Sequence, residues 1–268
     1  MLHTAVYGVL VVGGGCLAAL IGLELVQRLV PAVSRQRHND VAGFIYAALG
    51  VIYAVLLALV VITAWEEYQA ASETVEEEAN SVAEIFWLGY QLPEPEGTHL
   101  QELARAYAEE VVNKEWPLME EGRQPPLEQE AGTPAGWNLI DDIRVTLHGF
   151  EPHTKAEEQL YAEGLDQVGR LADARRTRLV ASEEGVPGVL WSVLIFGAIA
   201  TVGFTYLFGL ASTWAHRLMV LTLAAVIGLV LFTVGALGHP FSGGARIGTG
   251  FFELVLERFD TSKLSDLR

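Results

Sequence analysis

Apolar residues are gathered into four blocks along the chain, at residues of about 4–30, 41–64, 187–213 and 218–237. A membrane-crossing helix needs about 20 mainly apolar residues, and every block meets that length. Pro31 cannot continue the first helix, and Pro187 suits the first turn of the third. The pattern predicts an all-α integral membrane protein with four transmembrane helices in two hairpins.

The stretch between the hairpins is polar, and its apolar positions recur with helical spacing. After Trp65 they follow alternating steps of three and four: Tyr68, Ser72, Val75, Ala79, Val82 and Phe86. This heptad register continues back into the second span, so we expect one continuous helix that ends near Gly89. Further helices are expected over about 99–116, 137–147 and 154–182, with a Pro-rich loop over 122–136. The helix over 154–182 should run antiparallel to the long helix that ends near Gly89.

These elements divide the chain into four parts. Residues 1–64 and 186–238 form the transmembrane hairpins, and residues 65–185 form a helical water-soluble insert between spans two and three. Residues 239–268 form a glycine-rich segment followed by a helix. Because residues 251–259 are amphipathic, we expect that helix to lie at the membrane interface.

The formal net charge of -16 is concentrated in the insert. Residues 65–185 hold 27 acidic and 9 basic residues, a balance of -18, whereas the rest of the chain holds 6 acidic and 8 basic residues, a balance of +2. Nucleic acid binds through patches of Lys and Arg, so this negative field predicts no nucleic-acid partner.

Basic residues flank the ends of the spans unevenly. Arg28, Arg35 and Arg37 lie between spans one and two, and His216 and Arg217 are expected between spans three and four. Short loops rich in Lys and Arg stay in the cytoplasm, so we expect a multi-pass protein of the cell membrane with its N-terminus and acidic domain outside the cytoplasm. A second basic cluster, close to the third span, favours the opposite orientation: Arg170, Arg175, Arg176 and Arg178.

Glu24 is the one carboxylate inside the first span, where an ionisable group is costly unless it is paired or faces a polar pathway. Arg28 follows four residues later, the favourable order for an ion pair on a helix. One interpretation is therefore a structural pair at the interface, and the other is a role in an ion or proton pathway. Glu24, Arg28 and Asn39, a polar residue at the start of the second span, are the pore or gating candidates.

Small residues recur four apart in the spans: Gly14/Ala18/Gly22, Gly43/Ala47, Ala54/Ala58 and Ala224/Gly228. Such spacing lets membrane helices approach closely, although Gly and Ala are also simply common in such helices. The glycine run at 13–15 is similar to a dinucleotide-binding fingerprint, but its apolar surroundings extend through a whole span. We expect no cofactor and no catalytic residues. The insert also carries an acidic run, which we interpret as a solvated helix face without a specific metal site: Glu66, Glu67, Glu73, Glu76, Glu77, Glu78 and Glu84.

The segment after the fourth span contains His239, Pro240, Phe241 and Gly243. Its glycines permit sharp turns at the membrane edge. These four residues are the candidates for a pore mouth.

Several of these residues together resemble a family of bacterial membrane proteins described as bestrophin-like. The features that carry the resemblance are Asn39 with Gly43, Trp65-Glu66-x-Tyr68-x-x-Ala71, Glu78-Ala79, Glu115-Trp116, Arg175 with Arg178, Pro187 with Trp191, and Pro240-Phe241-Ser-Gly243. The resemblance implies four spans with a long helical insert. It extends to true bestrophins, which are pentameric anion channels with their large helical region in the cytoplasm.

These observations favour a homo-oligomeric, ion-conducting membrane protein, with a pentamer as one candidate stoichiometry. Its expected partners are the lipid bilayer, further copies of itself and inorganic ions. The acidic insert favours cations over anions. The alternative is a non-conducting scaffold or sensor whose helical insert binds a partner. An enzyme is not expected, because no nucleophile–base arrangement stands out.

Overall fold

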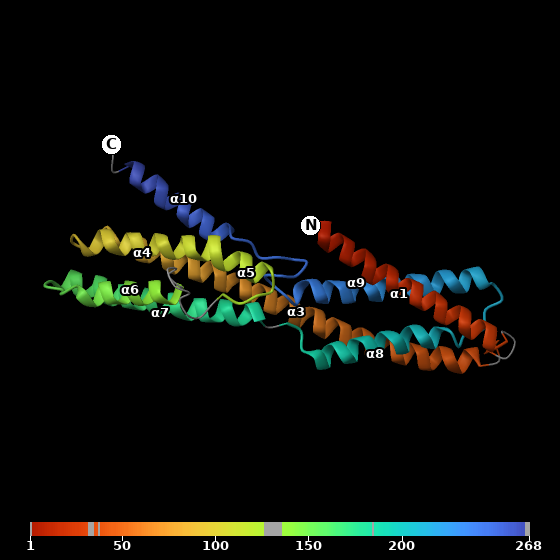
Figure 1. The fold of residues 1–268 in the computed structure, drawn as a ribbon. Coiled ribbons are helices and arrows are strands. Elements are labelled where there is room, and N and C mark those ends of the chain that lie inside the picture. The colour runs from red at the N-terminus through yellow and green to blue at the C-terminus, as the bar shows by residue number, and fades with distance from the viewer. Residues whose placement is uncertain (1, 32–34, 37, 126–135, 184, 266–268) are drawn as a thin grey trace. The chain divides into compact units, whose positions relative to one another are not determined.

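The computed structural model describes residues 2–31, 35–36, 38–125, 136–183 and 185–265. All regular structure in this part of the chain is helical (Figure 1). The helices are α1 (Leu2–Leu29), α3 (Asn39–Gly89), α4 (Glu96–Glu110), the π-helix η1 (Val111–Glu115), α5 (Trp116–Glu120), α6 (Gly136–Gly149), α7 (Lys155–Glu183), α8 (Gly188–Thr205), α9 (Thr213–Leu237) and α10 (Gly250–Ser265). Most of the loop predicted over 122–136 lies outside the described residues.

The chain divides into two compact units. The transmembrane unit comprises Met1–Glu67 with Gly185–His239, and the helical unit comprises Tyr68–Glu184 with Pro240–Arg268. Among the described residues, four helical stretches are long and apolar enough to cross a membrane; they lie within Val6–Leu29, Asn39–Gly89, Lys155–Thr205 and Thr213–Leu237. The fold class predicted from the sequence is therefore confirmed. So is the single long helix α3, which contributes to both units.

In the transmembrane unit, α1 and α9 pack antiparallel, and small side chains bring them close together. Ala19 and Leu23 of α1 are buried with Val220 and Ala224 of α9. A Cβ atom on Gly228 would meet the Cα atom of Val12 at 3.4 Å, an ordinary van der Waals contact, so the backbones of the two helices lie close together here.

The helices α3 and α8 meet at Tyr53, whose hydroxyl donates to the carbonyl of Leu194 at 2.9 Å. A Cβ atom on Gly197 would lie 2.4 Å from the Tyr53 ring, so only glycine fits at this contact. A buried tyrosine needs such a partner for its hydroxyl, and the carbonyl of α8 supplies it.

The boundary between the third and fourth spans differs from the prediction. Helix α8 ends at Thr205 rather than near residue 213, and α9 begins at Thr213 rather than near residue 218. Ser212 caps α9 by accepting a hydrogen bond from the backbone N–H of Ala215. The prediction was wrong here because the apolar composition runs through the linker and hides the cap. His216 and Arg217, expected in this loop, are in α9.

In the helical unit, the apolar face of α3 forms part of the core, together with residues of α4, α6, α7 and α10. Val75, Ala79, Val82 and Phe86 of the predicted heptad register are all buried there. Leu88 of α3 lies beside Gly164 of α7, and Glu78 lies beside Arg178, so the two helices are antiparallel as predicted. The extramembrane part of the heptad register is thus covered by the chain itself and is not available to another copy.

Helix α10 was expected at the membrane interface, but its apolar face packs against the core of the helical unit. Phe252, Val255 and Phe259 are buried, and Phe259 stacks on Phe86 with ring centroids 3.7 Å apart. Arg105 of α4 binds Asp260 at 2.7 Å on the rim of this contact. The amphipathic pattern was identified correctly, but a protein core covers it instead of lipid.

Candidate functional site

Polar side chains gather at one end of the transmembrane unit, where the end of α1 meets the start of α9. Glu24 accepts a hydrogen bond from Arg217 at 2.7 Å, and its other oxygen lies 3.7 Å from Arg28 Nε. Arg28 was expected as the partner of Glu24, whereas Arg217 was missed because it was placed in a loop. The carboxylate is thus shared by two arginines and links α1 to α9.

Arg35 and Asn39 bind the linker between α8 and α9 at the same end. The Arg35 side chain is buried and donates to the carbonyls of Tyr206 and Phe208 at 2.9 and 3.3 Å. The Asn39 amide donates to the carbonyl of Gly209 and accepts from its N–H, at 2.9 and 3.0 Å. The Asn39 amide therefore pairs with the backbone of the linker as another peptide group would.

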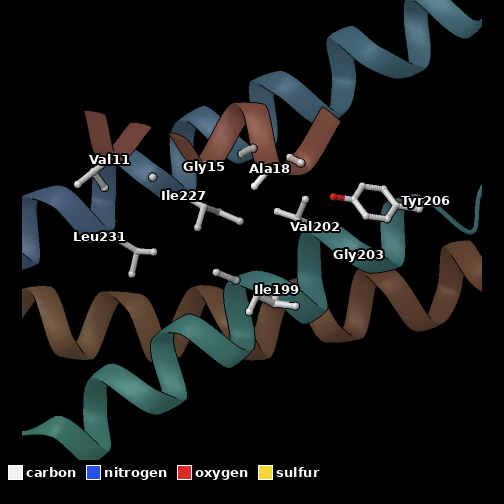
Figure 2. A pocket seen from close by; sticks show the side chains of 13 residues that line it. Val11, Gly15, Ala18, Ile199, Val202, Gly203, Tyr206, Ile227 and Leu231 are labelled. Atoms are coloured by element: carbon white, nitrogen blue, oxygen red, sulfur yellow. The ribbon is translucent and has the colours of Figure 1, made fainter. Parts of the chain in front are cut away.

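An apolar groove of about 330 Å³ lies between α1, α8 and α9 (Figure 2). Small residues of α1, such as Gly15 and Ala18, line one side, and the Tyr206 hydroxyl points into the groove at one end. The lining carries no charged side chain. An uncharged, mainly apolar lining of this kind suits hydrocarbon better than an ion.

The four residues predicted at a pore mouth have different environments. His239 is exposed and Gly243 is half-buried. Phe241 is only 1 % exposed and packs edge-on against Trp116, with ring centroids 5.6 Å apart. The carbonyl of Pro240 accepts from the N–H of Ile247, which closes a tight loop. The Phe241 side chain thus anchors this segment in the core of the helical unit.

A π-helical turn places a carboxylate inside the helical unit. In η1, the N–H of Trp116 bonds the carbonyl of Val111, five residues back. Pro117 has no N–H to donate, and this favours a break in the regular α-helical ladder at that point. The wider turn leaves Glu115 and Trp116 both buried, at 3 % and 1 % exposure.

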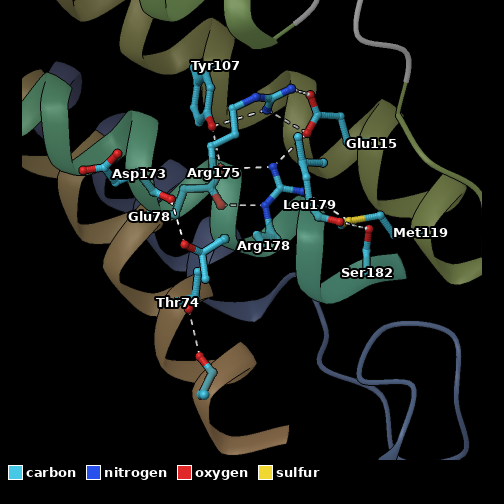
Figure 3. A network of polar contacts seen from close by, with 12 residues as sticks. Thr74, Glu78, Tyr107, Glu115, Met119, Asp173, Arg175, Arg178, Leu179 and Ser182 are labelled. Carbon is cyan, nitrogen blue, oxygen red and sulfur yellow. Dashed lines mark hydrogen bonds and ion pairs between the residues drawn. The ribbon is translucent and has the colours of Figure 1, made fainter. Parts of the chain in front are cut away.

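Glu115 belongs to a buried network with Glu78 of α3, Tyr107 of α4, and Arg175 and Arg178 of α7 (Figure 3). Arg175 binds Glu115 through both terminal nitrogens, at 2.9 and 2.7 Å. Arg178 bridges the two carboxylates: it donates to Glu115 at 2.8 Å and to both oxygens of Glu78. Two acids and two bases balance, so the network is neutral and ties three helices together.

Aromatic rings and one glycine enclose the guanidinium groups. Arg175 lies over the ring of Trp137 at 5.2 Å, and Arg178 lies over Trp116 at 5.9 Å. A Cβ atom on Gly136 would lie 2.3 Å from Arg175 Nη1, so the start of α6 can approach only as glycine.

The network also sets the protonation of its members. Burial alone would raise the pKa of Glu115, but the charges of Arg178 and Arg175 outweigh it and hold that pKa below 4.5. Burial, reinforced by the charge of Glu78, raises the pKa of Tyr107 well above 10.0, so the phenol stays protonated and donates to Glu78. Because the pKa of Glu115 is depressed, its stabilising contribution is present at neutral pH and is lost as the pH falls below 4.5 through the lowered folded-state pKa.

Sequence reasoning missed this network as a structural site. Glu78 was interpreted as part of a solvated acidic run, yet its side chain is fully buried. The available signal was its position next to Ala79 in the heptad register, together with the spacing of Arg175 and Arg178 on one face of α7. The other six members of the acidic run are exposed, as expected.

The fold and these contacts define a multi-pass, all-helical membrane protein whose helical unit is held by buried ion pairs. Residues 13–250 match the family model of the Bestrophin-like domain. The chain therefore belongs to the bestrophin-like family, as the resemblance in the sequence indicated.

Solved structures support the same fold. Two crystal structures of variants of a bacterial bestrophin homologue from Klebsiella pneumoniae are similar to the chain, with TM-scores of 0.59 and 0.60 at 12% identity, covering 94% of this chain and 97% of theirs. The crystal structure of a variant membrane protein is also similar, with a TM-score of 0.59 at 14% identity, covering 90% of this chain and 95% of that one. No curated protein matches the sequence.

We expect Arg178→Met to lower the free energy of unfolding of the helical unit by about 3–5 kcal/mol, because it leaves the Glu78 carboxylate buried without its main partner. Arg176→Met is the matched control, since Arg176 is on the same helix but pairs with Asp173 at the surface, and should cost less than about 0.5 kcal/mol. Denaturant unfolding of the full chain, followed by tryptophan fluorescence, measures both. Equal effects of the two substitutions would show that the network does not stabilise the unit.

Proposed function

We propose that this protein is a homo-oligomeric ion-conducting membrane protein that favours cations. Membership of the bestrophin-like family carries the proposal, together with the similarity to the bacterial bestrophin homologue. The proposal includes the lipid bilayer, inorganic ions and further copies of the chain as partners.

The transmembrane unit supports assembly from several copies. The two clusters of hydrophobic residues buried between its described helices contain no charged side chain, and this favours an ion path formed between copies. Gly13, Gly14 and Gly15 of α1 and Gly43 and Gly50 of α3 have open space where a side chain would be. Exposed small residues let helices of neighbouring copies approach closely, and a pore then forms on the symmetry axis.

Helix α3 is the candidate for lining that axis. Its exposed residues Val55, Leu59, Ile62, Glu66 and Glu73 follow steps of four, three, four and seven, so they form one row along the helix. Repeated around an axis, the apolar members would form a constriction and the glutamates an acidic vestibule. Rings of glutamate concentrate cations, and this supports the selectivity that we propose.

Glu24, Arg28 and Asn39 stand in this proposal as pore or gating residues, and His239, Pro240, Phe241 and Gly243 as residues of the pore mouth. The contacts of Glu24 with Arg217 and of Asn39 with Gly209 join helices at one end of the transmembrane unit. A rearrangement there would change how α1, α3 and α9 pack, and this change is the proposed basis for gating.

We also propose that the N-terminus and the acidic helical unit lie outside the cytoplasm. Arg28, Arg35 and Arg217 share one end of the transmembrane unit, as the positive-inside rule requires of a cytoplasmic end. Arg175 and Arg178, which favoured the opposite orientation, are neutralised in buried ion pairs.

For conduction, we expect purified protein in liposomes to pass potassium and sodium in preference to chloride. Glu24→Gln should change flux or selectivity because it removes the charge shared by two arginines, and Arg28→Leu should change them less because Arg28 is the more distant partner. Ion-gradient flux assays measure both variants against the unmodified protein. Absence of flux of any ion above empty liposomes, across pH and voltage, would refute the proposal and favour the scaffold or sensor.

For orientation, we expect an impermeant thiol reagent to label intact cells at Glu158→Cys and not at Gln36→Cys, each introduced into a Cys16→Ala background. Glu158 is exposed on α7, and Gln36 lies between the first two spans. Labelling after permeabilisation controls for the accessibility of each thiol. Labelling at position 36 but not at 158 in intact cells would reverse the orientation.

A further inference from the structure

The apolar groove between α1, α8 and α9 is accessible from the surface of the transmembrane unit. Ala224, Ile227 and Gly228 of α9 line it and are buried, whereas Gly15 of α1 and Ile199 of α8 line it and are exposed. The groove thus has a floor on α9 and outward-facing edges on the other two helices. Lipid tails surround the exposed faces of membrane helices, so a hydrocarbon chain has direct access to it.

The dimensions of the groove suit a single lipid tail. It extends along α1 from Val11 to Ala19 and along α8 from Ala198 to Tyr206, which is about 12 Å on each helix at the rise of an α-helix. The hydrocarbon core of a bilayer is about 30 Å thick, so the tails of one leaflet span about 15 Å. The volume of about 330 Å³ is near the lower limit for ligand pockets, about 300 Å³, which favours one chain over two.

One end of the groove reaches a charged cluster formed by Glu24, Arg28 and Arg217. The Tyr206 hydroxyl points into the groove at this end (Figure 2). A Cβ atom on Gly22 would lie 2.8 Å from the Tyr206 ring, so this ring packs closely against α1. Glu24 and Arg28 follow on the next turns of α1, and Arg217 of α9 binds Glu24. The groove therefore runs from the apolar part of the unit up to the charged cluster.

Positive charge is in excess at this end. Two exposed guanidinium groups share one carboxylate, because Arg28 and Arg217 both pair with Glu24. Arg35 is only 8 % exposed, donates to two backbone carbonyls, and pairs with no carboxylate among the described residues. Asp40, exposed at the start of α3, is the second acid here. Three arginines against two acids leave a positive charge, which attracts an anion.

We propose that the groove binds one acyl chain of an anionic phospholipid whose phosphate is held by Arg28 and Arg217. Guanidinium groups donate to phosphate oxygens in charge-assisted hydrogen bonds, and the Tyr206 hydroxyl donates to the ester carbonyl between phosphate and chain. The lipid then joins α1 to α9 at their charged end. This site depends on the membrane-spanning character of the chain and not on conduction, so it is tested separately from the proposed function.

The test is native mass spectrometry of the full chain in detergent, titrated with phosphatidylglycerol or with phosphatidylcholine of the same acyl chains. The unmodified protein should retain one phosphatidylglycerol per chain. It should bind this lipid about fivefold more tightly than phosphatidylcholine, because one uncompensated arginine near a membrane surface contributes about that factor. Equal binding of the two lipids, or displacement of the lipid by free glycerol phosphate, would overturn the proposal.

Gly203→Leu should weaken phosphatidylglycerol binding about tenfold or more, because the new side chain displaces at least two methylene groups from the groove. A Cβ atom on Gly203 would have no neighbour within 4 Å, so leucine enters open space. Gly15→Leu fills the groove from α1, also without a clash, and should have the same effect. The matched control is Gly188→Leu, which adds the same side chain to open space on α8 outside the groove and should change binding less than about twofold.

Unchanged binding in both groove variants would overturn the site. So would a changed oligomer mass in these variants with the number of lipids per chain unaltered, because a second copy of the chain would then occupy the groove.

Glu24→Gln/Arg28→Gln/Arg217→Gln removes one net positive charge without leaving an unpaired carboxylate, and it should abolish the preference for phosphatidylglycerol. Arg144→Gln removes the same net charge from the surface of the helical unit and should leave the preference unchanged. Equal effects of these two changes would overturn the assignment of the phosphate to Arg28 and Arg217.

Discussion

The helical unit depends on the pairing of two fully buried arginines with two buried glutamates. Arg178 holds Glu78 of α3 and Glu115 of η1 simultaneously, and Arg175 holds Glu115 through a two-pronged contact. Four ionised groups in a protein interior are tolerated only when each is paired, so the helices that carry them must meet in one register. Three further features accommodate this arrangement: the π-helical turn before Pro117, the glycine at 136, and the aromatic rings around the guanidinium groups.

In the rest of the chain, lipid and water impose different constraints on how helices pack. In the transmembrane unit, lipid removes any hydrophobic drive between helices, so small residues such as Gly197 set how closely helices approach, and charged side chains gather where α1 meets the start of α9. In the helical unit, water supplies that drive, and an apolar core covers α10 and the heptad face of α3. The glutamates of α3 that remain exposed provide the negative surface on which the proposed cation preference rests.

Much of the fold follows from periodicity in the sequence. The four spans, the continuous α3 and the antiparallel α7 were predictable because apolar blocks and heptad spacing persist over many residues. The end of α8 and the start of α9 were not, because the linker is as apolar as the helices. Glu78 and Arg217 were not predicted for a related reason. A charged residue is expected to be exposed unless its partner is known, and the partners here, Arg178 and Glu24, lie 100 and 193 positions away along the chain.

The central claim is that several copies of the chain form one ion-conducting assembly. The most direct test is native mass spectrometry of the purified protein, in mild detergent and in nanodiscs. Our account predicts a single species whose protein mass is a several-fold multiple of the 29.2 kDa chain. A monodisperse monomer under both conditions would contradict it, because the account places the ion path between copies of the chain.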